Sequence, residues 1–210
     1  MENNRGNKNL GQAVIATENE HKLKEIGAIL KDLHLEVLSI KDVGLEGLEI
    51  IENGDTFEEN ALIKARAVME RAGKLAIADD SGLEVDILNN RPGIYSARFA
   101  GENATDDENN KKLLKLLEAV PLYDRTARFV CSIAAVFPNG DAIVLRGECP
   151  GIIGLEPKGR GGFGYDPLFI VEKYNKTFAE LGERKKNRIS HRAVALEKLK
   201  RELKARLKNR

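Results

Sequence analysis

The 210-residue sequence is poor in the two residue types that build disulfide frameworks and most zinc sites, with two cysteines and three histidines. Cys131 lies within an apolar run and Cys149 directly precedes Pro150, so the two form no CxxC motif. This pattern argues against a disulfide scaffold and against a cysteine zinc site. We therefore expect both cysteines to pack in the core, and we expect no histidine-based metal site.

The sequence also lacks an excess of charge of either sign and lacks a long apolar run. Lys and Arg total 34 against 33 Asp and Glu, which leaves no global field to attract a nucleic acid or an anionic membrane surface. No apolar run approaches the ~20 residues that span a bilayer, and the N-terminal residues have no hydrophobic signal core. We expect a cytoplasmic protein with no nucleic-acid or membrane partner. The locally basic residues 198–210 are interpreted as the solvated face of a closing helix in preference to a nucleic-acid arm.

The apolar fraction of 42% and the charged fraction of 32% are those of a globular protein that can bury a sizeable core. Strand-like and helical patterns alternate early in the chain, and residues 126–137 and 142–148 are β-prone runs that surround a PNGD turn. A hairpin is antiparallel, whereas strands joined through helices run parallel. We predict an α/β fold around a mixed sheet, as one domain over residues 1–210 with residues 1–10 as a flexible extension.

Capping patterns set the predicted helix ends. Thr56 with Glu59 forms a capping-box pattern for a helix that Gly73 can end, and Thr105 with Glu108 forms a second. Leucines 113, 114, 116 and 117 of this second helix are expected in the core. The expected elements are strands at 13–17, 35–40 and from 75 to the acidic pair, and helices at 19–33, 57–72 and up to about 119.

Asp79 and Asp80 stand side by side where the third predicted strand runs out. Ionised neighbours repel, and burying either carboxylate without a partner is costly or raises its pKa. The pair therefore needs a cation or hydrogen-bond donors. Mg²⁺ takes one or two protein carboxylates together with substrate phosphate, so Glu52 is a candidate partner in such a site. Lys64, two turns into the helix that begins after Thr56, can meet the same phosphate.

The stretch ATENEHK joins the first predicted strand to the first predicted helix. Amides at a helix start carry partial positive charge, and Thr17, Asn19 and Lys22 add a hydroxyl, an amide and an ammonium. The stretch is a candidate phosphate cradle. The equally weighted alternative is that Thr17 or Asn19 only caps the helix.

The stretch KGRGGFGYDP contains the spacing G-x-G-x-x-G at Gly159, Gly161 and Gly164. A dinucleotide fingerprint must follow a strand and open a helix, but here a proline precedes the glycines and Pro167 follows them, so this function is excluded. What remains is a glycine loop that presents an aromatic face and a carboxylate, suited to a nucleobase. The commoner alternative is a surface turn with packed aromatics. The residues concerned are Phe163, Gly164, Tyr165 and Asp166.

Ser190 is a predicted helix cap, which places His191 and Arg192 in the first helical turn. A cation there opposes the helix dipole, and an anionic ligand would reverse that penalty. The arrangement therefore hints at ligand binding, although a lone histidine is more often structural.

Four segments read together resemble the inosine triphosphate pyrophosphatase family, the Ham1-like XTP/dITP diphosphatases. They occur in the family's order between residues 13 and 199, and they are ATENEHKLKE, DTFEENALIKA, ADDSGLEVDILNNRPGIYSARFAG, and GGFGYDPLF followed by ISHRAVAL. In the first segment Glu20 and His21 stand where many relatives have a glycine before the lysine.

The resemblance implies an elongated fold of two lobes around a mixed sheet, with the active-site cleft between the lobes, and a homodimer. It also implies Mg²⁺-dependent hydrolysis, with Mn²⁺ as a substitute ion, of ITP, dITP and XTP to the monophosphate and pyrophosphate, which would cleanse the nucleotide pool.

The residues matched to the family's motifs take their roles from the resemblance alone. Asp80 is the implied catalytic base, and Glu52 and Asp80 are the implied metal-associated carboxylates. Ser81 is an implied substrate contact. The implied phosphate contacts are Thr17, Asn19, Lys22 and Lys64, and the implied base and ribose pocket is Phe163, Gly164, Tyr165, Asp166, Lys186, His191 and Arg192.

Two other interpretations compete with this one. Maf-like pyrophosphatases also begin with a strand and a polar phosphate loop, but the SHR and FGYD segments argue against them. A nucleotide sensor that binds without hydrolysis would not need a positioned base, and the presence of both Glu52 and Asp80 argues against it.

Overall fold

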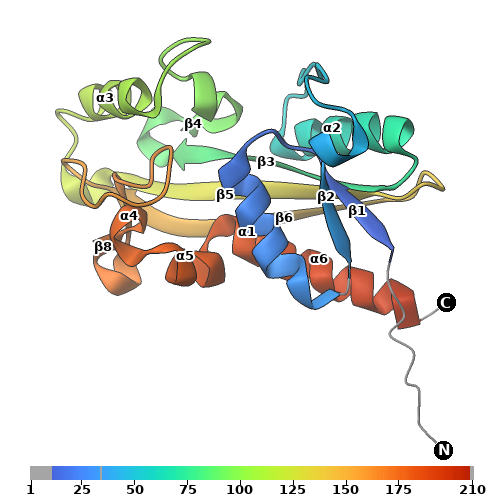
Figure 1. Ribbon diagram of the computed structural model, residues 1–210. Helices are drawn as coiled ribbons and strands as arrows, with labels where there is room; N and C mark the ends of the chain where they lie inside the picture. Colours follow the sequence, from blue (N-terminus) through green and yellow to red (C-terminus); the bar gives the residue numbers. More distant parts are fainter. Residues whose placement is uncertain (1–10, 34, 209–210) are drawn as a thin grey trace, which may run out of the picture.

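The structure is a computed structural model that describes residues 11–33 and 35–208, so the predicted extension at residues 1–10 lies outside the described residues. Within that part of the chain, eight strands form one sheet in the order β2-β1-β3-β5-β6-β7-β8, with β4 paired to β3 (Figure 1). The strands are β1 Gln12–Ile15, β2 Glu36–Ser39, β3 Leu75–Val85, β4 Arg91–Pro92, β5 Thr126–Val136, β6 Ala142–Ile153, β7 Phe169–Val171 and β8 Lys176–Thr177.

The sheet is mixed, as the sequence predicted. Strand β1 runs parallel to β2 and β3, and helices α1 and α2 lie in the two connections. From β3 onward, consecutive pairs along the sheet are antiparallel, including the long β5–β6 hairpin. Central strand β3 thus joins a parallel half to an antiparallel half, and it is the strand that carries Asp79 and Asp80.

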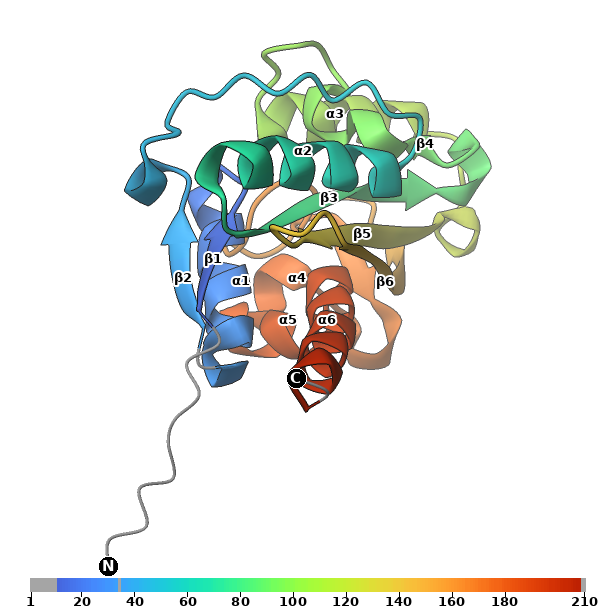
Figure 2. The same ribbon diagram turned by 90° about the vertical axis from the view of Figure 1, so that its right-hand side faces the viewer.

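Helices cover both faces of the sheet (Figure 2). On one face, Ile26 of α1 and Leu196 of α6 belong to a core with Ile77 and Ile133. On the other, Ala61 and the rest of the inner side of α2 pack on small residues of β1, β3 and β5. A third core includes Leu113 of α3 and Phe178 of α4. The helices are α1 Glu20–Leu30, α2 Phe57–Ala72, α3 Asp106–Leu116, α4 Phe178–Leu181, α5 Glu183–Ile189 and α6 His191–Lys208.

The predicted caps explain where α2 and α3 start. Thr56 accepts from the Glu59 amide and Gly73 ends α2 at φ 61°, but the Glu59 carboxylate accepts from the Asp55 amide instead of closing the box at Thr56. The box formed by Thr105 and Glu108 is complete. Local capping chemistry was therefore a sound guide to these two helix starts.

Three other predictions have clear outcomes. Strand β3 does not run out at the acidic pair but continues to Val85, because β5 pairs with it along nearly its whole length, including Asp80 with Ser132. The expectation that Leu116 is in the core is wrong: it is 42% exposed, on the outer face of α3. Cys131 and Cys149 are both buried and free, as expected.

Across residues 11–33 and 35–208, we find no helix with the length and apolar character needed to cross a membrane.

Helix α6 approaches the sheet unusually closely at Gly147. A Cβ at this position would lie 2.3 Å from the carbonyl oxygen of His191 and 2.5 Å from the nitrogen of Ala195. Glycine is therefore required on β6 for α6 to lie against the sheet with its first turn next to the middle of β3.

We predict that Gly147→Ala lowers the free energy of unfolding by about 1–3 kcal/mol, because the added methyl group overpacks the contact between α6 and β6. Gly27→Ala in α1 is the matched control: its Cβ would meet nothing within 4 Å, so it should raise stability by about 0.5–1 kcal/mol through the better helix propensity of alanine. Urea unfolding of both variants measures the two changes. Equal stability of Gly147→Ala and the wild type would contradict the packing argument.

Candidate active site

The side chain of Asp79 leaves β3 toward α1 and α6, and Asp80 leaves toward α2, because successive residues of a strand point to opposite faces. The repulsion that two adjacent carboxylates imply is therefore relieved by the pleat of the strand. Each acid meets its own set of cations.

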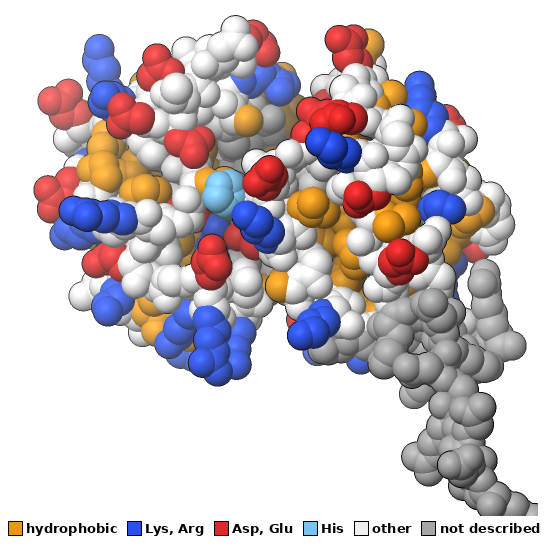
Figure 3. Space-filling model, viewed as in Figure 1, with side chains coloured by type: hydrophobic (Ala, Val, Ile, Leu, Met, Phe, Trp, Pro, Cys, Tyr) orange, Lys and Arg blue, Asp and Glu red, His pale blue; other side chains and the backbone are white. Residues whose placement is uncertain are grey.

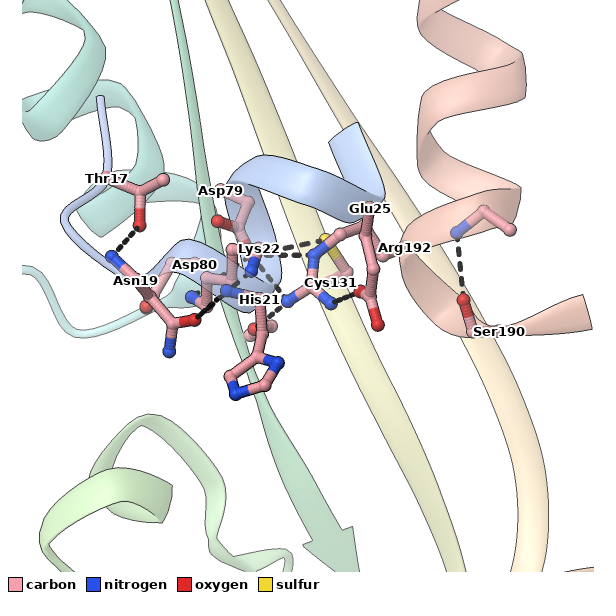
Figure 4. Close-up of polar contacts among 12 residues, drawn as sticks. Thr17, Asn19, His21, Lys22, Glu25, Asp79, Asp80, Cys131, Ser190 and Arg192 are labelled. Atoms are coloured by element: carbon pink, nitrogen blue, oxygen red, sulfur yellow. Dashed lines mark hydrogen bonds and ion pairs between the residues drawn. The ribbon is translucent and has the colours of Figure 1, made fainter. Parts of the chain in front are cut away.

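One oxygen of Asp79, Oδ2, meets two cations, whereas its Oδ1 is buried with no hydrogen-bond partner. Lys22 Nζ lies 3.1 Å from Asp79 Oδ2, and Arg192 donates to the same oxygen at 2.9 Å and 3.2 Å (Figure 4). Burial alone would raise the pKa of Asp79, but Lys22 and Arg192 outweigh it and hold the pKa well below its ordinary value. Asp79 is therefore an ionised anchor that draws α1 and α6 onto β3.

Asp80 has fewer partners. Its Oδ1 lies 3.3 Å from Lys64 Nζ, while Oδ2 is buried with no hydrogen-bond partner. Burial raises the pKa of Asp80 above its ordinary value, and Lys64 offsets only part of that rise. Lys64 also lies 2.7 Å from Glu52 Oε2. Two neighbouring carboxylates thus have pKa values displaced in opposite directions, a pattern typical of a site where one acid is structural and the other reactive.

The loop before α1 serves as a helix cap. Asn19 Oδ1 accepts from the amides of His21 and Lys22 at 2.9 Å and 3.1 Å, and Thr17 Oγ1 accepts from the Asn19 amide. The capping alternative is therefore confirmed for Asn19. Capping does not compete with the proposed cradle, because Thr17, Asn19 and Lys22 also line a cavity of about 340 Å³ together with Glu52, Lys64 and Asp79.

A second cavity, of about 160 Å³, shares Asn19 and Lys22 with the first. Charged side chains of both signs and a histidine gather at the middle of this face of the molecule (Figure 3). The structure brings eight of the nine remaining predicted site residues to this cavity, whereas Asp80 lines neither cavity. The eight are Ser81, Phe163, Gly164, Tyr165, Asp166, Lys186, His191 and Arg192.

All three cations that line this second cavity, Lys22, Lys186 and Arg192, are already committed to carboxylates. Lys186 Nζ lies 2.7 Å from Asp166 and 3.2 Å from Glu25, and Arg192 contacts Glu25 as well as Asp79. The unfavourable placement of Arg192 in the first turn of α6 is thus compensated from within the protein. Lys186 Nζ also sits 4.4 Å from the centre of the Phe163 ring, which places a charge over the aromatic face.

His191 is buried and stacks on Phe129 with ring centroids 4.8 Å apart, and its Nδ1 has no hydrogen-bond partner. Burial, with Arg192 and Lys186 nearby, lowers the pKa of His191 well below its ordinary value. His191 is therefore a neutral ring at the floor of the cavity at neutral pH.

The sequence interpretation missed several side chains at this site. Glu25 joins Lys186 to Arg192, and the signal was available because Glu25 follows Lys22 by three residues on one face of α1. Ser96, Asp106 and Asn109 also line the second cavity, and nothing in their local sequence pointed there.

Few acidic side chains are placed to bind a divalent cation at this site. Among the described residues, no group of three or more His, Cys, Asp or Glu side chains is placed to hold a metal. Glu52 and Asp80 nevertheless share Lys64, and Asp80 Oδ2 has no partner. With both acids ionised, one lysine leaves this group one negative charge in excess, so its oxygens fit an ion such as Mg²⁺ whose other ligands are phosphate and water.

Comparisons with known proteins identify the family of this chain. The model of the Ham1 family matches residues 13–202. A dITP/XTP pyrophosphatase of Desulforamulus reducens is 55% identical over 186 residues, which cover 88% of this chain and 92% of that protein. The corresponding protein of Bacillus subtilis is 48% identical and covers 92% and 98%.

Solved structures give the same result. The Staphylococcus aureus Ham1 protein superposes with a TM-score of 0.84 at 42% identity, covering 93% of this chain and 99% of that one. A HAM1 protein of Coxiella burnetii also gives 0.84, at 43% identity over 92% and 98%. The family inferred from the motifs is confirmed and the Maf-like alternative is removed: the chain belongs to the Ham1 family.

Proposed function

We propose that this protein hydrolyses deaminated purine nucleoside triphosphates, ITP, dITP and XTP, to the monophosphate and pyrophosphate. The names of its relatives support the reaction. The observation that carries the proposal is the pair of adjoining cavities, one lined by lysines and carboxylates and the other by an aromatic ring and paired ions. A triphosphate suits the first and a base suits the second. A homodimer, implied by the family resemblance, and a cytoplasmic location, expected from the lack of a long apolar run and of a signal core, stay predictions.

In this proposal the triphosphate lies against the start of α1. The amides of the first helical turn, Thr17, Lys22 and Lys64 bind its oxygens and offset its negative charge. A water molecule attacks the α-phosphorus, the bond from this phosphorus to the bridging oxygen breaks, and pyrophosphate leaves with that oxygen. Asp80 accepts the proton that the water loses. Its raised pKa makes it a better base than an ordinary exposed carboxylate.

Glu52 and Asp80 would hold Mg²⁺, with Mn²⁺ as a substitute. When bound, the ion would neutralise charge on the triphosphate and support the departing pyrophosphate. The excess negative charge of Glu52, Lys64 and Asp80 supports this proposal, because a triphosphate would otherwise be repelled by the same acids that its hydrolysis uses.

The base would lie in the second cavity near Phe163, Lys186 and Arg192. Hypoxanthine and xanthine carry a 6-oxo group that accepts hydrogen bonds, whereas adenine has a 6-amino group that donates them. Cationic donors from Lys186 or Arg192 would leave the adenine amino group unpaired, and burying it in that state is costly. Glu25 and Asp166 hold these donors in place.

The reaction, the metal and the specificity are tested together by measuring pyrophosphate release from ITP, dITP, XTP and the common triphosphates, with and without Mg²⁺. We expect turnover of the deaminated purines to exceed that of ATP and GTP by at least tenfold, and to be lost without a divalent ion. Dominant turnover of pyrimidines would contradict the substrate class. Tight ITP binding without pyrophosphate release would instead indicate a sensor.

Asp80→Asn should lower kcat by at least the ~100-fold that a general base contributes, while KM stays within an order of magnitude. The side chain keeps its size, so the variant should remain folded, and loss of a buried charge whose pKa is raised should not lower the thermal midpoint. Asp124→Asn, an exposed position outside both cavities, is the control and should behave as the wild type. Near-normal kcat in Asp80→Asn would refute the assigned base.

The pH dependence of kcat/KM tests the electrostatics of the same residue. A base must be ionised, so activity should fall as the pH drops through a pKa of Asp80 that lies above the ordinary 3.8. Because Lys64 lowers the pKa of Asp80, Lys64→Met should move this acid limb to higher pH, in addition to weakening substrate binding. Lys24→Met, exposed on α1, should leave the limb in place. An unchanged acid limb in Lys64→Met would contradict the electrostatic effect of Lys64 on Asp80.

A further inference from the structure

The loop that forms one wall of the second cavity has little rigidity of its own. Residues 159–164, GRGGFG, include four glycines, and Gly159, Gly162 and Gly164 adopt positive φ angles of 85°, 78° and 60°. Glycine has more backbone conformational freedom than any other residue, so a segment with four glycines is flexible unless other contacts hold it. The position of the Phe163 ring therefore depends on contacts from other elements: His21 and Lys186 contact the ring itself, and further contacts are made with this backbone.

Helix α3 supplies two of these contacts at a single residue. Asp106 Oδ2 accepts from the Gly164 amide at 2.6 Å, and Asn110 Nδ2 donates to the Gly164 carbonyl at 3.0 Å. The two side chains are four residues apart on α3 and so lie on one face of the helix. Asn110 is only 7% exposed. The amide and the carbonyl of Gly164 are thus both hydrogen-bonded by side chains from one turn of α3.

The same turn of α3 also holds the opposite wall. Asn109, 3% exposed, accepts from the Ala100 amide at 2.7 Å and donates to the Ala97 carbonyl at 3.0 Å. The two walls are joined directly, because Tyr165 donates its hydroxyl hydrogen to the Ser96 carbonyl at 2.8 Å. Helix α3 therefore fixes the separation of two segments that lie more than sixty residues apart in the chain.

These contacts lie at the cavity itself and not at a remote surface. Asp106, Asn109, Ala97 and Gly164 all line the second cavity. Two residues after Gly164, Asp166 binds Lys186 at 2.7 Å and accepts from the Phe163 amide at 3.0 Å. A shift of Gly164 would consequently displace the aromatic face and the ion pair together.

We propose that Asp106, Asn109 and Asn110 form a polar clamp that positions both walls of the base cavity and so sets base discrimination. This inference rests on the proposed function of the cavity, and it assigns the three residues as positioning residues that act through the backbone of Gly164, Ala97 and Ala100. Asp80 and Lys64 lie on β3 and α2, outside the clamp, so the chemical step should be affected little.

The test uses four variants of the full chain. Asp106→Ala and Asn110→Ala each remove one contact with Gly164, whereas Asp106→Asn keeps an oxygen that can accept from the Gly164 amide. Asp107→Asn is the matched control, since Asp107 is the next residue, is exposed, and pairs with Lys111 in the same helix. Two quantities are measured: KM and kcat for ITP and ATP, and hydrogen exchange of the peptide that contains Gly164, without nucleotide.

We expect both alanine variants to raise KM for ITP by roughly tenfold, the effect of losing a hydrogen bond at a buried site, with kcat changed less than threefold and with the preference for ITP over ATP reduced. Exchange at Gly164 should be faster in both, near normal in Asp106→Asn, and unchanged in Asp107→Asn. Rescue by asparagine distinguishes positioning from an effect of the carboxylate charge.

The outcomes separate the clamp from the function on which it rests. A wild-type protein with no activity on ITP would overturn the proposed function, and base discrimination by the clamp with it. An active wild type whose alanine variants keep normal KM, normal preference and slow exchange would overturn the clamp alone. Equal damage from Asp106→Asn and Asp106→Ala would also overturn it, because the charge and not the contact with Gly164 would then matter.

Discussion

The ion pairs of Asp79 are the interaction on which the rest of the site depends. This carboxylate is buried in the centre of the sheet, and Lys22 from α1 and Arg192 from α6 both reach it. Removing one member of a buried pair typically costs about 3–5 kcal/mol, since the charge that remains has neither water nor a partner. Three elements from opposite ends of the chain are therefore held together by one oxygen of one side chain.

This constraint also makes Asp80 chemically different from its neighbour. Lys22 and Arg192 contact Asp79 on the far side of the strand, whereas Asp80 forms its ion pair with Lys64, which it shares with Glu52. Lys22 also lowers the pKa of Asp80, without forming an ion pair with it among the described residues. Burial then dominates and raises the pKa of Asp80. The alternation of a β-strand thus produces one carboxylate whose pKa is held low by cations and one whose pKa is raised by burial.

The ionic cluster next to the base cavity extends the same principle. Lys22, Arg192 and Lys186 are matched by Asp79, Glu25 and Asp166, so the cluster is neutral as a whole. The group of Glu52, Lys64 and Asp80 instead carries one negative charge in excess when both acids are ionised. In the proposed function the base and the triphosphate would therefore meet different electrostatic environments in two adjoining cavities, with Lys22 lining both.

The sequence by itself determined the features that local contacts control. The caps at Thr56 and Thr105, the hairpin at 126–148 and the capping loop before α1 depend on residues a few positions apart, and the family's motifs were sufficient to identify most of the charged and aromatic residues that line both cavities. Tertiary structure alone decided that β3 continues through the acidic pair, because the backbone pairing between β3 and β5 extends past Asp79 and Asp80. It also decided which aspartate pairs with Arg192, since Arg192 lies 113 residues from Asp79 in the chain. In the same way, it decided that Asn110 and Asp106 of α3 reach Gly164, which lies 54 and 58 residues away. Local spacing carries no information about such partners, whose proximity arises only when the sheet and its helices pack together.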